Sequence, residues 1–315
     1  MKRIFLCLLV LLFPMLGCRT ETAHSAAGIA CDTVVTVTAY APQETVDGTL
    51  RICADYEALL SKTIEGSDVW DLNRAYGKPV EVHPETAELL CLAVEIGEAS
   101  GGAFDVTIAP VSGMWDFTAE DPVLPDPDAL RLAAARVDYR NVEIDGNTVT
   151  LKNGAEIDLG GIAKGYIADR VAEYLREQGV TSACINMGGN VLTIGTKPDG
   201  SPWTIGIRDP NGTPEQSAEV LKLGGAAVVT SGNYERFFVR DGVRYHHILD
   251  PKTGMPVSNG LASVTIIGTH SDLCDALSTA CFVLGEEASR PILDRYGVQA
   301  IFLYGDGSRS AYPEN

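Results

Sequence analysis

The spacing of hydrophobic positions predicts a chain that mixes helices with many strands. Valine and threonine dominate Thr33–Tyr40, which favours a strand, whereas apolar residues at helical spacing favour a helix over Thr49–Leu60. A further helix is expected to open at Pro84 and to run to about Ser100, where two glycines end it. These segments therefore predict one strand followed by two helices in the first hundred residues.

Strands are expected to dominate the second half. Two glycine turns, at Asp145-Gly-Asn147 and Asp241-Gly242, predict hairpins, and Gly165–Gln178 has the pattern of an amphipathic helix. Residues 119–128, rich in proline and acidic side chains, are expected to form a surface loop. Because the strands do not alternate regularly with helices, an α+β fold is preferred to a doubly wound sheet. The other predicted strands are Ala183–Ile185, Val191–Ile194, Trp203–Ile207, Ala226–Thr230, Ser263–Ile267 and Ala300–Tyr304, the last two bracketing two helices.

The N-terminus has the pattern of an exported protein. Lys2 and Arg3 precede an apolar run that is shorter than the roughly 20 residues of a membrane-spanning helix. Met15-Leu-Gly-Cys18 resembles the lipobox of bacterial lipoproteins, with an ordinary secretory signal and a chance cysteine as the alternative. We expect a signal peptide at 1–17, a lipid on Cys18, a polar tether at 18–28 and one domain at 29–315. That arrangement implies the bacterial cell envelope, with the protein anchored to the periplasmic face of the inner membrane.

Charge and cysteine content exclude several classes of function. The formal net charge is −18 and no basic stripe is present, so nucleic acid is not an expected partner. No C-x-x-C or H-E-x-x-H motif occurs, which disfavours structural zinc. The cysteines beyond Cys7 and Cys18 are expected to be buried small hydrophobic residues rather than a disulfide framework.

Two segments carry the strongest chemical signal. Asp158-Leu-Gly-Gly-Ile-Ala-Lys-Gly-Tyr166 places a carboxylate, a glycine pair and a lysine at the start of a predicted helix, which suits a phosphate. Asp275 and Thr279 are four residues apart on one predicted helix face, where both oxygens could bind a hard divalent cation. Together they predict chemistry on a phosphorylated ligand, with a diphosphate favoured.

Other segments have two interpretations each. Asn186–Asn190 could wrap a phosphate with its amides or form a tight glycine turn. Phe104 could stack on an aromatic ligand whose hydrogen bonds Asp105 accepts, or it could belong to the core. Ser231 could lie near a ligand or in a turn at a strand end. His247 is a candidate base, with a histidine satisfied by a nearby carbonyl as the alternative.

Read in order, these segments resemble the FAD:protein FMN transferase family, known as ApbE. That resemblance implies an α+β fold similar to the T-fold, FAD as substrate and Mg²⁺ as cofactor. It also implies transfer of FMN to a threonine of membrane redox subunits, with release of AMP. The matching segments are SGGAFDVTIAP (100–110), DLGGIAKGYIADR (158–170), INMGGN (185–190), VVTSGNYERFF (228–238), YHHILDPKTGMP (245–256) and DALSTACFVLG (275–285).

The resemblance also implies roles for individual residues. His247 matches the proposed base of the family. The metal ligands would be the Gly161 carbonyl, Asp275, which we also count as catalytic, and Thr279. The flavin contacts would be Ala103, Phe104, Asp105, Asp158, Lys164 and Ile248.

Two positions depart from the family pattern. Cys31-Asp-Thr33 stands where the family often has Met-Gly-Thr, so a sulfur contact from Cys31 is retained. Thr63 stands where the family often has a tyrosine that could shield the flavin from water. We therefore expect a lipid-anchored, Mg²⁺-dependent flavin transferase, with an FAD pyrophosphatase giving FMN and AMP as one alternative. A flavin-binding lipoprotein without catalysis is the other.

Overall fold

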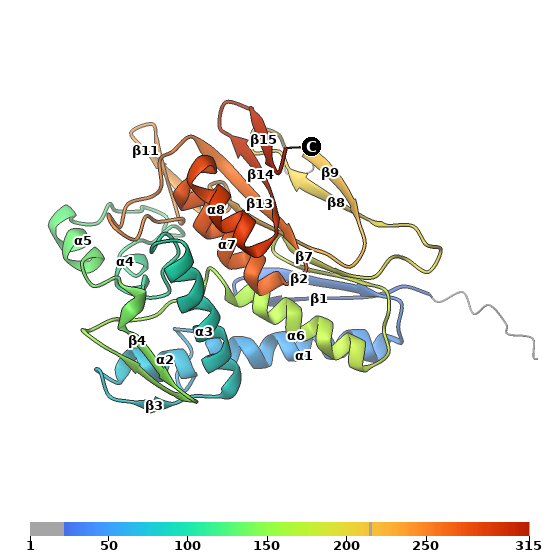
Figure 1. Cartoon of the computed structure of the whole chain (residues 1–315), viewed down its shortest axis with the longest axis horizontal. Helices are drawn as coiled ribbons and strands as arrows, with labels where there is room; N and C mark the ends of the chain where they lie inside the picture. Colours follow the sequence, from blue (N-terminus) through green and yellow to red (C-terminus); the bar gives the residue numbers. More distant parts are fainter. Residues whose placement is uncertain (1–21, 214–215, 315) are drawn as a thin grey trace, which may run out of the picture.

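The computed structural model describes residues 22–213 and 216–314. Within them, an eight-stranded sheet has the order β1-β2-β6-β7-β10-β13-β14-β15, and every neighbouring pair is antiparallel (Figure 1). The predicted tether at 18–28 is wrong from His24 onward, because residues 24–30 pair with β2 as an edge strand. The strands are β1 (His24–Ala30), β2 (Thr33–Ala39), β6 (Ala183–Met187), β7 (Asn190–Ile194), β10 (Ala227–Gly232), β13 (Leu261–Gly268), β14 (Gln299–Tyr304) and β15 (Arg309–Tyr312).

The two faces of this sheet are covered differently. Helices α1 (Gln43–Leu60), α6 (Ala163–Glu177) and α7 (Ser271–Leu284) pack on one face, and α8 (Glu286–Tyr296) follows α7. Figure 1 shows α1 and α6 lying side by side. Hairpin β8 (Trp203–Arg208) and β9 (Ser217–Leu223) covers part of the other face, where its Trp203 and Ile205 contact residues of β7 and β10. Successive residues of a strand point to opposite faces of the sheet, so they belong to separate apolar clusters.

Smaller elements surround this core. The helices are α2 (Asp68–Arg74), α3 (Pro84–Ala99), α4 (Ala109–Ser112) and α5 (Pro127–Ala134), with a 3₁₀ turn at Tyr139–Asn141. A three-stranded sheet contains β3 (Val80–Glu81), β4 (Val142–Asp145) and β5 (Thr148–Leu151), and a separate hairpin contains β11 (Phe237–Arg240) and β12 (Val243–His246). Both predicted glycine-turn hairpins are therefore confirmed.

Gly165 allows α6 and α7 to approach closely. A Cβ atom at this position would lie 2.2 Å from the Ser271 carbonyl oxygen and 2.7 Å from the Asp272 Cα. Only a residue without a side chain fits between the two backbones. This contact brings the start of α6 beside the first turns of α7, which is where the two strongest sequence motifs lie.

The cysteine predictions are mostly confirmed. Cys53, Cys274 and Cys281 are buried, and the six cysteines in the described ranges are all free thiols. The predicted burial is not met by Cys91, which is exposed on α3, and only in part by Cys31 and Cys184, which are half-buried. In residues 22–213 and 216–314 no helix has both the length and the apolar character needed to cross a membrane. The predicted signal peptide and Cys18 lie outside the described residues.

Candidate active site

The close contact of α6 and α7 forms the centre of the candidate site. Asp275 is buried on α7, and its Oδ2 accepts a hydrogen bond from the Gly165 backbone N–H at 2.9 Å. The Lys164 ammonium lies 3.6 Å from the same carboxylate oxygen. A buried carboxylate is thus held between a helix N-terminus and a lysine, both of which favour its negative charge.

The three predicted metal ligands converge at this point. Thr279 lies one turn after Asp275 on α7, and a Cβ atom placed on Gly161 would be 3.5 Å from the Thr279 hydroxyl oxygen. The Thr279 hydroxyl also lies 3.2 Å from the Ser231 Oγ on β10. In the described part of the chain no group of three or more His, Cys, Asp or Glu side chains could hold a metal.

This donor set nevertheless suits one kind of cation. A single carboxylate, a hydroxyl and a backbone carbonyl are hard oxygen donors, and Mg²⁺ is commonly held by one or two carboxylates together with substrate phosphates. This donor set differs from the nitrogen- and sulfur-rich sites that are typical of zinc. Asp275, Thr279 and Gly161 therefore fit a magnesium ion that arrives with a phosphorylated substrate.

Phe104 and Cys31 lie at the edge of this centre. A Cβ atom on Gly161 would be 3.2 Å from the Phe104 ring, so the ring packs directly on the glycine turn. Burial, and then the charge of Glu57, raises the pKa of the Cys31 thiol to about 11, while the nearby Lys164 acts in the opposite direction. Cys31 is thus a neutral thiol beside Lys164, which suits the predicted sulfur contact rather than a nucleophile.

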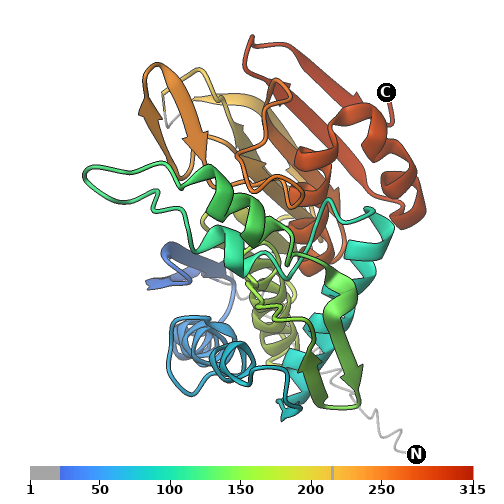
Figure 2. The same cartoon turned by 90° about the vertical axis from the view of Figure 1, so that its left-hand side faces the viewer.

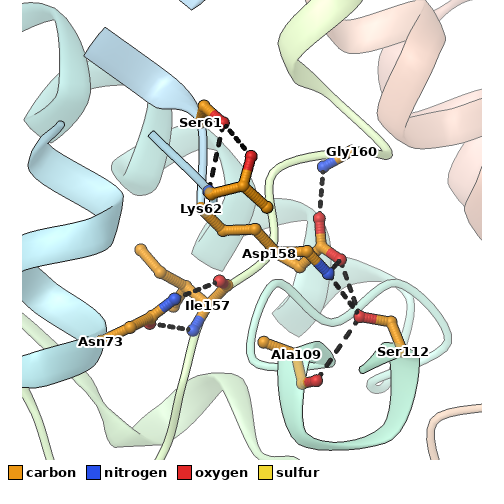
Figure 3. A network of polar contacts seen from close by, with 9 residues as sticks. Ser61, Lys62, Asn73, Ala109, Ser112, Ile157, Asp158 and Gly160 are labelled. Atoms are coloured by element: carbon orange, nitrogen blue, oxygen red, sulfur yellow. Dashed lines mark hydrogen bonds and ion pairs between the residues drawn. The ribbon is translucent and has the colours of Figure 1, made fainter. Parts of the chain in front are cut away.

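A network around Asp158 holds the glycine turn in place (Figure 3). Asp158 Oδ2 accepts hydrogen bonds from the Lys62 ammonium at 2.6 Å and from the Ser112 hydroxyl at 2.7 Å. Its Oδ1 accepts the Gly160 N–H at 2.9 Å. Burial opposes ionisation, but Lys62 and these hydrogen bonds together lower the pKa of Asp158 below its usual value. Asp158 is therefore an ionised anchor for the loop that leads into α6.

Lys62 was missed by the sequence analysis, and its neighbour Thr63 was chosen instead. The structure directs Lys62 onto Asp158, whereas Thr63 is exposed and its hydroxyl lies 3.0 Å from Ser61 Oγ. The sequence offered one indication of Lys62: this lysine stands next to Thr63, where the chain departs from the family pattern. Lys62 and Asp158 are 96 residues apart, so spacing along the chain could not pair them.

His247 lies directly after β12, and both its N–H and its ring contact the same carbonyl. The backbone N–H donates to the Arg236 carbonyl at 3.1 Å, and ring Nδ1 lies 3.3 Å from that oxygen. Burial, followed by the charges of Arg236 and Lys164, lowers the pKa of His247 to about 4. The imidazole is therefore neutral at pH 7 and able to accept a proton. Its neighbour His246 is buried, and its Nε2 contacts the Val257 carbonyl at 3.0 Å.

The Asp105 carboxylate forms hydrogen bonds within the protein. Its Oδ1 accepts hydrogen bonds from the Thr107 N–H and hydroxyl, and its Oδ2 accepts from the Tyr139 N–H at 2.8 Å. Burial raises the pKa of Asp105 against these hydrogen bonds. The structure thus uses both carboxylate oxygens to shape the 100–107 loop, and the predicted ligand contact of Asp105 stays a prediction.

A pocket of about 370 Å³ lies beside the same loop. Ala103 lines it, together with the turn that begins at Asp250 and the last turn of α7 at Val283 and Leu284. Ile248 is buried in the main core with Phe104, and its carbonyl accepts the Val257 N–H. The pocket is large enough for part of an aromatic ligand and lies about one helical turn from Thr279.

Comparison with known proteins shows the family to which this chain is similar. A family model described as the ApbE family matches residues 31–302. A FAD:protein FMN transferase of Treponema pallidum (strain Nichols) is 40% identical over 268 residues, which cover 79% of this chain and 74% of the relative. One from Klebsiella pneumoniae (strain 342) is 40% identical over 253 residues, covering 79% and 78%.

Solved structures agree as well. The crystal structure of an ApbE protein from Thermotoga maritima superposes with a TM-score of 0.85 at 36% identity, covering 92% of this chain and 96% of the other. The apo flavinyl transferase ApbE of Pseudomonas stutzeri gives 0.81 at 30% identity, covering 92% and 94%. Fold and site thus define an enzyme of the transferase class, with the predicted α+β architecture confirmed. The chain belongs to the ApbE family.

Proposed function

We propose that this protein transfers the FMN half of FAD to a threonine of an acceptor protein and releases AMP. The observation that carries the proposal is the buried Asp275 carboxylate, held beside Lys164 and the Gly161 turn where α6 meets α7. A diphosphate is bound by positive groups and helix N-termini, and this position offers the Lys164 ammonium at the start of α6. The names of the relatives supply the substrate.

The reaction is a phosphoryl transfer. The acceptor hydroxyl oxygen forms a bond to the phosphorus of the FMN half, and the bond from that phosphorus to the bridging oxygen breaks. AMP leaves with the bridging oxygen, and the threonine becomes a phosphoester. His247 is neutral and accepts the proton that the hydroxyl loses, which AMP or solvent then takes up.

The residues around the phosphates orient the substrate. Asp275, Thr279 and the Gly161 carbonyl would hold Mg²⁺, which supplies charge neutralisation at the diphosphate when bound. The Lys164 ammonium, 3.6 Å from Asp275, would turn toward a phosphate oxygen by rotation of its flexible side chain. The flavin ring would occupy the region between Phe104 and the pocket at Ala103.

The location of the enzyme is part of the proposal. A lipid on Cys18 would anchor the protein to the periplasmic face of the bacterial inner membrane. Its acceptors would then be threonine-bearing subunits of membrane redox complexes. Because β1 begins at His24, the tether between Cys18 and the fold is short, and the site would stay near the membrane surface.

FAD hydrolysis to FMN and AMP is a second candidate. Thr63 is exposed and small at the position where the family often has a tyrosine, and this leaves room for water beside the substrate. A non-catalytic flavin carrier is the third candidate, but a carrier needs neither a neutral histidine nor a cation site.

One experiment separates the three candidates. The protein is incubated with FAD and Mg²⁺, with and without a threonine-containing acceptor, and AMP and free FMN are separated by chromatography. Transfer predicts AMP release that rises with acceptor and exceeds free FMN. Equal amounts of AMP and FMN that do not depend on acceptor would indicate hydrolysis, and neither product would indicate a carrier.

A further inference from the structure

The hairpin β11–β12 stands apart from the main sheet (Figure 2, orange). It rests on a cluster of aromatic rings. Phe238 and Tyr245 face each other across the hairpin with ring centroids 5.3 Å apart. Trp115 lies 6.0 Å from Tyr245, and Phe117 lies 6.0 Å from Phe238. These contacts bury one face of the hairpin and hold it in a defined position.

The opposite face of the hairpin is apolar and exposed. Phe237 is 37% exposed and Val239 is 59% exposed, and both lie on the face that Phe238 does not share. Val243, near the turn, is also 51% exposed, but it pairs with Arg240 and lies on the face of Phe238 and Tyr245. Within the described residues no other strand pairs with either edge of the hairpin. A small apolar surface with free strand edges is typical of a site that binds an extended protein segment.

The hairpin also carries positive charge in an acidic protein. Arg236, Arg240 and Arg244 are exposed, and none of them lies within ion-pair distance of a carboxylate in the described ranges. Arg244 lies over the Phe237 ring at 4.4 Å, and Arg240 donates to the Pro122 carbonyl. The whole chain has 42 acidic residues against 24 basic ones. Arg244 lies on the face of Phe237 and Val239, whereas Arg240 lies on the face of Phe238. The hairpin is therefore positively charged on both faces, and this charge attracts a negatively charged segment.

This surface is continuous with the candidate base. Arg236 precedes β11, and its carbonyl accepts the N–H of His247, which follows β12. A segment that lies along the hairpin would therefore end beside the histidine that must meet the acceptor hydroxyl.

We propose that hairpin β11–β12 docks the flavin acceptor, and that it binds an extended segment with carboxylates and apolar side chains near the modified threonine. This inference rests on the proposed function. Because side chains of an extended segment alternate, one row of them covers Phe237 and Val239 and places a carboxylate near Arg244. Carboxylates of the other row meet Arg240. The rigid aromatic support lowers the cost of ordering the surface when the segment binds.

Two peptides test the proposal. Both are fluorescent 15-residue peptides with one central threonine and two leucines, and they differ only in four flanking positions, which are aspartate in one and lysine in the other. Binding to the protein in the presence of FAD and Mg²⁺ is measured by fluorescence anisotropy. We expect the acidic peptide to bind at least about tenfold more tightly, a difference that added salt reduces.

The variant R240E/R244E is expected to lose this preference, and R240Q/R244Q replaces it if the charge reversal prevents folding. The matched control R51E/R176E reverses two exposed arginines on α1 and α6 that have no ion pair in the described residues. The control keeps the preference. FAD binding stays unchanged in all variants, because neither arginine of the hairpin contacts the glycine turn or α7.

Three results would overturn the docking role. The first is equal binding of the two peptides, and the second is loss of the preference in R51E/R176E as well as in R240E/R244E. The third is an R240E/R244E protein that keeps the peptide preference but no longer binds phosphatidylglycerol vesicles. The last result would identify a membrane contact. AMP release is measured on the same samples, so the two hypotheses fail separately. Preferential binding without transfer contradicts the proposed function, whereas transfer without preferential binding contradicts the docking surface.

Discussion

Asp275 has two roles at the scale of single residues. Its carboxylate accepts the Gly165 N–H and thereby joins α6 to α7, and it is also the only charged member of the proposed magnesium ligands. A substitution that keeps the acceptor but removes the charge separates these roles. Asparagine does so, because its amide oxygen can still accept the Gly165 N–H.

Asp275→Asn is therefore expected to abolish Mg²⁺-dependent AMP release while the melting temperature changes little. Asp275→Ala should abolish release as well and should also reduce stability by about 1 kcal/mol, since a buried N–H loses its partner. Release is measured by chromatography in saturating Mg²⁺, with Asp128→Asn on exposed α5 as control. Unchanged turnover in the asparagine variant would show that Asp275 is not a ligand.

His247→Ala should slow transfer to a threonine acceptor by roughly 10²–10⁴-fold, the usual size of a general-base effect. FAD affinity should change little. Single-turnover rates and FAD titrations check this, with the exposed His270→Ala as control. A normal rate for each bound FAD, together with weak binding, would make His247 a ligand contact.

The lowered pKa of His247 also predicts the pH dependence of transfer. An imidazole with a pKa of about 4 stays neutral as pH falls from 8 to 5.5, so kcat/KM should lose little activity over that range. The profile of the His247→Ala variant provides the comparison. A loss in the wild type with a midpoint near 6.5 would mean that the base is an ordinary exposed histidine.

Thr63→Tyr tests the departure from the family pattern. If an aromatic side chain at this exposed position screens the diphosphate from water, the variant should release less AMP for each flavin attached to acceptor. Thr63→Ser serves as the control without added bulk. The ratio is measured by chromatography and acceptor absorbance. An equal ratio in all three proteins would show that residue 63 does not select the nucleophile.

At the scale of elements, the α6–α7 contact includes a carboxylate pair outside the site. The Asp272 N–H donates to Asp169 Oδ2 at 2.9 Å. Burial, and then the charge of Asp272, raises the pKa of Asp169 to about 7. When folding raises the pKa of a carboxyl group, ionisation of that group lowers the free energy of unfolding. This contact should therefore weaken as pH rises from about 4 to 7.

Asp169→Asn removes that titration. At pH 8 the free energy of unfolding of the variant should exceed that of the wild type by roughly 1 kcal/mol, which is about the energy of one pKa unit. At pH 5 this difference should be smaller. Thermal melts at both pH values measure the difference, with Asp294→Asn on α8 as control. An advantage that is equal at the two pH values would show that Asp169 does not titrate between them.

Local patterns predicted elements whose signals lie within a few residues. The glycine-turn hairpins, α3 with its proline start and the amphipathic α6 are examples. β1 was missed, because its alanines and serine resemble a linker and only pairing with β2 makes it a strand. The same limit applies to the site: Asp275 and Thr279 lie one turn apart, so their spacing is visible in the sequence, whereas Lys62 meets Asp158 only in the folded chain.

At the scale of the whole molecule, antiparallel pairing brings distant segments to one place. The loop after α1, the 100–107 loop, the start of α6, the end of β12 and α7 all contribute to the candidate site. The main sheet holds α6 and α7 on one face, and the docking hairpin stands beside His247. The fold thus places the candidate diphosphate site next to the proposed acceptor surface.

The central claim is that FMN moves from FAD to a protein hydroxyl at this site. Intact-mass spectrometry of a threonine-bearing acceptor, incubated with FAD and Mg²⁺, measures this directly. We predict a mass gain equal to FMN less one water, with one AMP released for each flavin attached, and no gain with Asp275→Asn. An unmodified acceptor, with AMP and free FMN accumulating in equal amounts, would contradict the account.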